Sequence, residues 1–249
     1  MLMEARSFVE GARALILWTA LRGDLETRSH DAAEREAAGD LMALLTPVIK
    51  AYCSDQGFQS AVKCQQVFGG AGYAKEYPAE QFVRDARIAM IYEGANGIQA
   101  MDLVGRKLPA NGGRALKLFF AEIERALAEA KDDAFLTPWA EGLSRAKTDL
   151  QSATMWLMQN GMSNPDNAGA GAMDYLYLTA LTALALMWLG LVKIAKAKLD
   201  AGDGDKAFYE AKITTGRYFL ARVLPETAGH LAKLKSGAEP VMALTAEQF

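Results

Sequence analysis

The longest uncharged stretch of the chain, from Tyr175 to Val192, places the strongest constraint on how it can fold. Its length is close to the roughly 18 apolar residues that mark a candidate membrane-spanning helix. Tyr, Thr, Ala and Gly occupy many of its positions, and a further amphipathic segment that could cover it follows in the sequence. We therefore expect a central buried helix surrounded by other helices, and no membrane span.

Apolar residues elsewhere recur at helical spacing. Within residues 1–22 they fall three and four positions apart, at Leu2, Ala5, Val9, Ala12, Leu15 and Ile16, which predicts one buried helix face. Within residues 138–160 a stripe repeats every seven residues, at Leu143, Leu150 and Leu157, with Ala146 and Ala153 between them. Because no segment alternates as a strand would, we predict an all-α protein.

The expected helices cover residues 1–22, 41–56, 58–68, 78–88, 96–108, 114–131, 138–160, 173–199 and 205–234, with a loop beginning at residue 22 and a break at Gly57. At helical spacing, the Trp and Met side chains of the second half are expected in the core, namely Trp139, Trp156, Trp188, Met155, Met158 and Met187. The run from Pro109 to Gly113 is the best domain boundary. It divides the chain into residues 1–111, an incomplete helical bundle, and residues 112–249, an antiparallel four-helix bundle.

Composition excludes several functional classes. A net charge of −3 over 249 residues provides no basic surface for nucleic acid. The chain has only two cysteines, Cys53 and Cys64, on neighbouring expected helices, so we expect no disulfide framework. His30 and His230 are far apart, which favours solvated or capping roles over a metal site. Charges such as Glu4 interrupt any signal-peptide pattern near the start, so we expect a cytoplasmic protein.

One carboxylate is isolated in the tetrad Ile91, Tyr92, Glu93 and Gly94, which the segment Ala95–Gly97 follows. The pattern predicts a turn that enters a helix whose first N–H groups lack intrahelical partners. By spacing alone, Glu93 is either a surface acid favoured by the helix dipole or a proton-transfer group.

Three ordered motifs surround Glu93. They are Q-x-x-G-G-x-G-Y at Gln66–Tyr73, E-Y-P-x-E-x-x-x-R-D-A-R-I at Glu76–Ile88, and I-Y-E-G followed by I-Q at Ile91–Gln99. Together they resemble the C-terminal signature of the flavin-dependent acyl-CoA dehydrogenases. A larger subclass of that family carries an additional helical domain, which residues 112–249 resemble.

The resemblance implies that Glu93 is the base that removes the α-proton of an acyl-CoA while the β-carbon delivers hydride to FAD. A carboxylate gains basicity when substrate displaces its water, so we expect Glu93 to face a cleft bordered by the glycine-containing segments, with its bulky neighbours assisting desolvation. The same resemblance places Tyr92 and Gly94 beside the substrate. It places Ala95, Asn96 and Gly97 beside the flavin, and Gln66, Gly69 and Gly70 near the adenosine half of an FAD held mainly by a neighbouring subunit.

Many family members carry Thr where Ala95 stands, so backbone groups alone would meet the flavin at that position. The family's N-terminal helical domain and β-domain would precede Met1, and the first helix has no N-cap, so we expect a C-terminal portion that binds FAD weakly when alone. The resemblance further implies electron-transfer flavoprotein as the electron acceptor and a homo-dimer or tetramer. The alternatives are an oxidase, a non-catalytic helical binding module, a DNA-binding relative of the alkylation-response flavoproteins, or a helical partner of a separate flavin subunit. Acyl chain length is not readable from these residues.

Overall fold

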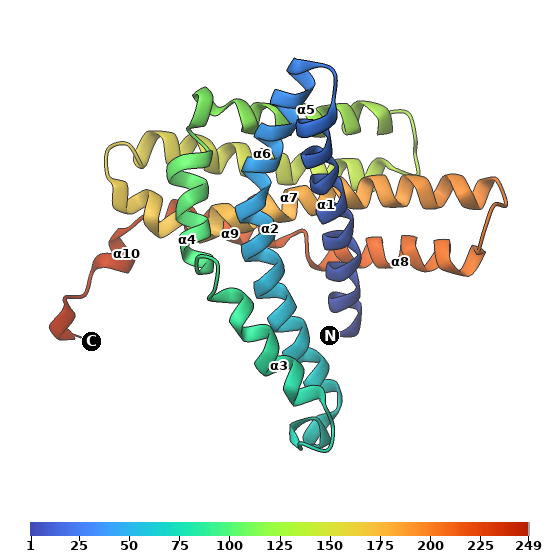
Figure 1. Ribbon diagram of the computed structural model, residues 1–249, viewed down its shortest axis with the longest axis horizontal. Helices are drawn as coiled ribbons and strands as arrows, with labels where there is room; N and C mark the ends of the chain where they lie inside the picture. Colours follow the sequence, from blue (N-terminus) through green and yellow to red (C-terminus); the bar gives the residue numbers. More distant parts are fainter. Residues whose placement is uncertain (249) are drawn as a thin grey trace.

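The computed structural model describes residues 1–248, and these form helices and helical turns without any strand, which confirms the all-α prediction (Figure 1). Two long antiparallel helices, α1 (Leu2–Arg28) and α2 (Ala32–Val67), cross a layer of helices built from the second half of the chain. The far half of α2 extends beyond this layer as an arm, and α3 (Ala79–Arg87) returns along it.

Helix α2 is longer than the sequence pattern indicates. The predicted loop at residues 22–40 and the predicted break at Gly57 are wrong, because α1 continues to Arg28 and α2 passes through both Pro47 and Gly57. The Asp31 side chain accepts a hydrogen bond from the Ala33 amide at 2.9 Å and caps α2. An isolated Gly inside a helix costs only about 1 kcal/mol, which packing against α1 easily exceeds.

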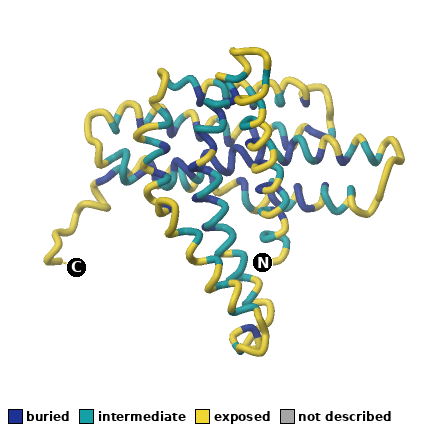
Figure 2. Tube along the Cα trace, in the orientation of Figure 1, coloured by how far each residue is buried: buried dark blue, intermediate teal, exposed yellow. Residues whose placement is uncertain are grey.

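The arm ends in a glycine-rich helical turn, η1 (Gly69–Tyr73). After α3 come η2 (Ile88–Met90), the turn at residues 91–95, α4 (Asn96–Asp102) and η3 (Leu103–Lys107), which return the chain to the body. Figure 2 shows the arm mainly in the colours of exposed and half-buried residues, whereas buried residues concentrate in the body. The arm therefore relies on the pairing of α2 with α3 and has little core of its own.

The second half comprises η4 (Ala110–Gly113), α5 (Arg114–Ala130), α6 (Thr137–Asn160), α7 (Pro165–Asp200), α8 (Lys206–Arg222), α9 (Glu226–Lys235), α10 (Glu239–Met242) and η5 (Ala246–Gln248). The single helix predicted at residues 205–234 is in fact α8 and α9. It breaks before Pro225, whose ring and missing N–H disfavour a continuing helix.

Helix α7 lies at the centre of the fold, as predicted. It is long and apolar enough to cross a membrane by length and composition, but 78% of its apolar window is buried by the rest of the chain. The predicted stripe of α6 is also buried, at Leu143, Ala146, Leu150, Ala153 and Leu157. Both observations fit a core helix covered by its neighbours.

The apolar core continues across the sequence boundary at residues 111 and 112. Leu15 of α1 and Leu44 and Val48 of α2 belong to the same buried cluster as Trp188 of α7. Gly11 lies so close to Trp188 that a Cβ there would stand 2.7 Å from the indole nitrogen. Lys212 of α8 also donates to Glu10 of α1 at 2.7 Å. Helices from both halves of the sequence therefore pack as one body.

Two predictions about buried faces are wrong in part. Met155 and Met158 are 60% and 62% exposed, because α6 turns them away from its buried Leu stripe. On α1, the buried face carries Ser7, Gly11 and Leu15, while three predicted core positions, Leu2, Val9 and Ile16, are exposed.

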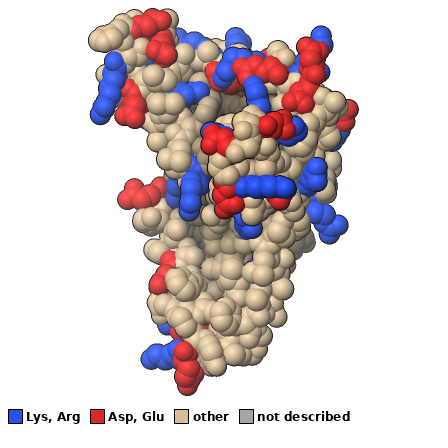
Figure 3. Space-filling view, turned by 90° about the vertical axis from the view of Figure 1, so that its right-hand side faces the viewer, with Lys and Arg blue, Asp and Glu red and all other residues tan. Residues whose placement is uncertain are grey.

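In the side view of Figure 3, charged side chains gather over the upper part of the molecule and the lower part shows fewer of them.

Candidate active site

The turn between η2 and α4 is held in an unusual backbone conformation. Glu93 has φ of 54° and Gly94 has φ of 79°, both in the left-handed region. For a residue with a Cβ this region costs about 1–2 kcal/mol. Side chains fix the turn from two directions: Gln99 Nε2 donates to the Glu93 carbonyl at 2.9 Å, and Lys50 Nζ donates to the Gly94 carbonyl at 2.8 Å. The predicted turn into a helix is therefore present, and it is constrained.

The Glu93 side chain is exposed, and among residues 1–248 no cation forms an ion pair with it. Its neighbours Ile91 and Tyr92 are 50% and 54% exposed, so they do not shield the acid within residues 1–248, and their part in desolvation by substrate stays a prediction. Glu93 also lies outside the two interhelical cavities described for the chain, which lie between α1, α5 and α7 and between α1, α2 and α8. Residues 1–248 do not form the cleft expected around Glu93, because they leave residues 91–95 of the turn exposed.

Asn96, the first residue of α4, is buried behind the turn. Its Nδ2 donates to the Asp55 carboxylate at 2.6 Å, to the Ser54 hydroxyl at 2.9 Å and to the Ala51 carbonyl at 3.2 Å. Its Oδ1 accepts from Lys50 Nζ at 2.8 Å. The side chain is thus occupied within the protein, and any contact between Asn96 and a cofactor is limited to its backbone.

This polar cluster reaches the central helix. The Tyr177 hydroxyl of α7 donates to the second oxygen of Asp55 at 2.9 Å. Burial, and then the neighbouring Asp55 carboxylate, raise the pKa of Tyr177, so the hydroxyl remains a donor. The ring of Tyr177 packs against Tyr52 and His230, with ring centroids 5.1 Å away in each case.

His230 differs from its predicted solvated or capping role. It lies within α9, its side chain is largely buried against Tyr177, and its Nδ1 is 2.7 Å from the Asp174 carboxylate.

Sequence reasoning did not identify Lys50, Ser54, Asp55 or Tyr177. A signal was present in α2, where three polar residues fall within about a turn and a half of an otherwise apolar segment. Such residues on a core-facing surface are expected to have partners, because a buried polar group without hydrogen bonds costs free energy. Nothing in the local pattern indicated which partners they would have.

The glycine-rich turn lies at the opposite end of the arm. Gln66, Gly69 and Gly70 are exposed, Gly69 has φ of 59°, and no atom lies within 4 Å of a Cβ built at Gly69 or Gly70. Backbone groups at these two positions are therefore open to close approach by a ligand. Gly72 has a different role, since a Cβ there would stand 2.4 Å from the Gln65 carbonyl oxygen.

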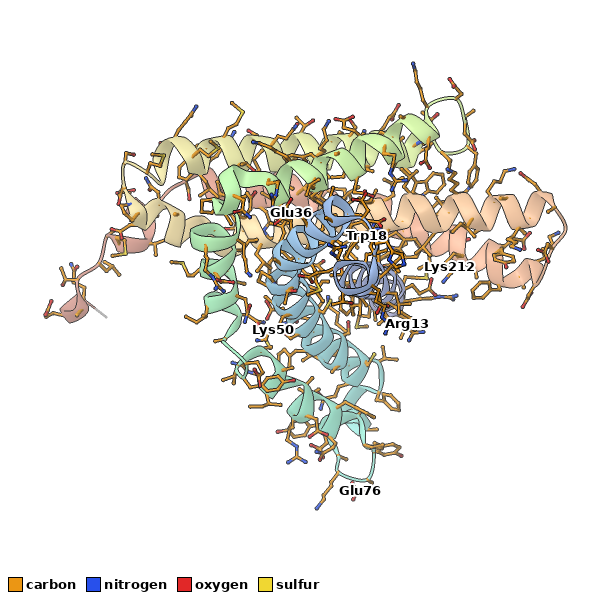
Figure 4. The ribbon with its side chains drawn as sticks, turned by 45° about the horizontal axis from the view of Figure 1, so that its top comes forward. Arg13, Trp18, Glu36, Lys50, Glu76 and Lys212 are labelled. Carbon is orange, nitrogen blue, oxygen red and sulfur yellow. The ribbon has the colours of Figure 1, made fainter. Side chains whose placement is uncertain are left out.

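The structure does not bring the two turns together. Lys50 contacts the turn after Glu93, whereas Gln65 contacts Gly72, and at 1.5 Å per residue the helix separates them by about 22 Å. Figure 4 shows this separation through Lys50, near the middle of α2, and Glu76, at the tip of the arm. The other predicted cofactor contacts, Ala95 and Gly97, are exposed beside Glu93. No cluster of three or more His, Cys, Asp or Glu suited to a metal ion occurs within residues 1–248.

Two family descriptions match the sequence. "Acyl-CoA dehydrogenase, C-terminal domain" matches residues 17–108, and "Acetyl-CoA dehydrogenase C-terminal like" matches residues 119–245, slightly more than half of the chain.

Curated relatives match along almost the whole chain. The 3-methylmercaptopropionyl-CoA dehydrogenase of Ruegeria pomeroyi is 34% identical over 97% of this chain and 41% of its own length. A butyryl-CoA dehydrogenase of Syntrophomonas wolfei is 31% identical over 100% of this chain and 41% of its own length. The broad-specificity linear acyl-CoA dehydrogenase of Mycobacterium tuberculosis is 30% identical over 90% of this chain and 38% of its own length. The chain thus spans about two fifths of the length of these relatives.

Among solved structures, Caenorhabditis elegans ACDH-11 in complex with C11-CoA superposes with a TM-score of 0.64 at 18% identity. The match covers 87% of this chain and 34% of that one. At this identity the likeness concerns the fold alone.

Proposed function

This chain belongs to the acyl-CoA dehydrogenase family, and we propose that it forms the C-terminal part of a flavin-dependent enzyme that oxidises an acyl-CoA to its trans-2-enoyl-CoA. The observation that carries the proposal is the unpaired carboxylate of Glu93 and the backbone conformation of its turn. Its carboxylate has no ion-pair partner within residues 1–248, and it sits on a strained turn that Lys50 and Gln99 hold in place.

In this proposal Glu93 takes the proton from the carbon next to the thioester. Lys50 and Gln99 act on the backbone on either side of it, so the carboxylate projects from a fixed point without being neutralised. Because the chain leaves Glu93 exposed, the walls that exclude water must come from outside it. The longer relatives have the additional length to supply them.

The residues present fit a flavin through backbone groups. Gly69 and Gly70 have open space where a side chain would stand, and Ala95 and Gly97 are exposed beside Glu93. FAD, when bound, supplies the hydride acceptor for the β-carbon. The separation of about 22 Å along α2 between the two turns supports their meeting different flavins or different ends of one flavin, with Gln66 near the adenosine half.

The relatives named above act on acyl-CoA thioesters of different kinds, and we extend to this chain only the shared thioester class. We further propose electron-transfer flavoprotein as the electron acceptor. Exposed apolar residues on α1 and the arm, including Val9, Ile16, Phe68 and Phe82, support a homo-dimer or tetramer. Release of hydrogen peroxide during turnover would instead favour an oxidase.

The test is Glu93→Gln in the flavin-loaded enzyme that contains this chain. Substrate added without oxygen should bleach the flavin of the wild type and should fail to bleach the variant, because the amide cannot accept the α-proton. Glu141→Gln, an exposed acid-to-amide change on α6, provides the matched control and should bleach at the wild-type rate. Bleaching of Glu93→Gln at that same rate would exclude Glu93 as the base and assign proton removal to another group of the enzyme.

A further inference from the structure

We infer that the second half of the chain, through Tyr177 of α7, positions the turn that carries Glu93. The connection is a hydrogen-bonded relay from Tyr177 to Asp55 to Asn96. Its effect on catalysis rests on the function proposed above, whereas its effect on the conformation of the turn does not depend on that function. The three side chains come from α7, α2 and α4, and the relay ends at the first residue of the helix that follows the turn.

The first step of the relay depends on the burial of Asp55. This carboxylate is only 8% exposed, and no ion pair within residues 1–248 neutralises it. A buried charge is tolerated only when its oxygens are hydrogen-bonded. Tyr177 donates to one oxygen at 2.9 Å and Asn96 donates to the other at 2.6 Å, so Asp55 needs both partners.

The second step connects Asn96 to the turn. Asn96 is 7% exposed, so its amide cannot exchange these partners for water without cost. Its Oδ1 accepts from Lys50 Nζ, and the same ammonium group donates to the Gly94 carbonyl, each at 2.8 Å. The position of Asp55 thus fixes Asn96, and Asn96 together with Lys50 fixes the backbone next to Glu93.

Tyr177 is suited to be the fixed end of the relay. It stands on the central helix, and its ring is held between Tyr52 of α2 and His230 of α9. His230 is in turn paired with Asp174 at 2.7 Å. Because His230 and Asp174 belong to α9 and α7, they anchor Tyr177 independently of α2, which makes Tyr177 a positioning residue for the turn.

The experiment compares Tyr177→Phe with Tyr175→Phe. Each variant removes a single tyrosine hydroxyl from α7. Tyr175 is fully buried and shares its hydrogen bond with Thr154 of α6, so this hydroxyl has no contact with the relay. Amide hydrogen exchange is measured by mass spectrometry on the intact protein. In Tyr177→Phe, exchange of residues 94–99 should accelerate by about tenfold or more, whereas in Tyr175→Phe these amides should exchange at the wild-type rate.

A second measurement uses the flavin-loaded enzyme. Tyr177→Phe should slow flavin bleaching by substrate at least several-fold with unchanged flavin content, and Tyr175→Phe should not. Unchanged exchange at residues 94–99 in Tyr177→Phe, or an equal change in both variants, would overturn the relay. If Glu93→Gln still bleaches while the exchange difference is observed, the proposed role of Glu93 as the base fails and the relay stands.

Discussion

Replacing Glu93 by Gly and by Ala tests whether the turn holds its strain in solution. Both variants remove the carboxylate, but only Gly also removes the Cβ that opposes the left-handed backbone at φ of 54°. We therefore expect Glu93→Gly to be more stable than Glu93→Ala. Both should lose substrate-dependent flavin bleaching in the complete enzyme.

The size of the difference follows from two opposing effects. The left-handed conformation costs a residue with a Cβ about 1–2 kcal/mol. Gly has the more flexible unfolded chain, which lowers its stability relative to Ala by about 0.4–1 kcal/mol. Their balance at position 93 favours Gly by roughly 0.5–1 kcal/mol.

The assay is urea unfolding followed by far-ultraviolet circular dichroism, with the free energy of unfolding compared between the two variants. Glu124, exposed within α5, is the control position. Glu124→Gly and Glu124→Ala both remove its ion pair with Lys147, so the comparison isolates backbone preference. In a helix the sign reverses, and Ala should be more stable than Gly by about 1 kcal/mol.

A Glu93→Ala variant as stable as Glu93→Gly, alongside the normal reversed order at position 124, would refute the strained turn. The argument that Lys50 and Gln99 hold Glu93 against its conformational preference would then be lost.

Three further predictions concern the body of the protein. Gly11→Ala should lower the free energy of unfolding by about 1–3 kcal/mol in urea titrations, because its Cβ would overlap Trp188. Stability should fall above about pH 10 in urea titrations, because burial raises the pKa of three tyrosines whose neutral forms the fold favours, Tyr52, Tyr175 and Tyr177. Replacing exposed Val9 and Ile16 by Lys should reduce self-association of the chain, measured by sedimentation velocity.

Each of these has its own check. Gly57→Ala adds a methyl group where nothing lies within 4 Å, so it should stabilise the helix by about 0.5–1 kcal/mol, and a loss there would contradict the packing argument. The tyrosine argument has a defined sign: the folded pKa values lie above the unfolded value, so this stabilisation is complete below pH 10 and is lost as the pH rises. Constant stability between pH 9 and 11 would contradict it. Unchanged association of the Val9 and Ile16 variant would place the contact elsewhere.

The local sequence pattern predicted a helix well where a single apolar stripe dominated it. It predicted poorly where two signals competed, such as helix propensity against packing. The seven-residue Leu stripe of α6 is buried as expected. The low helix propensity of Gly predicts a break at Gly57, but pairing of α2 with α1 overrides that weak preference. On α1, periodicity identified a helix but misassigned part of its buried face, since Val9 and Ile16 are exposed. When a helix has apolar residues on two faces, its sequence does not reveal which face the rest of the protein will cover.

The sequence by itself determined the all-α class, the buried central helix and the motif that contains Glu93, because these depend on neighbours a few positions apart. The tertiary structure decided what holds that motif. Lys50 meets Gly94 across 44 positions, and Tyr177 meets Asp55 across 122, and no local spacing encodes such pairs. Their physical origin is burial: once α2, α4 and α7 pack together, each enclosed polar group requires a partner from another helix.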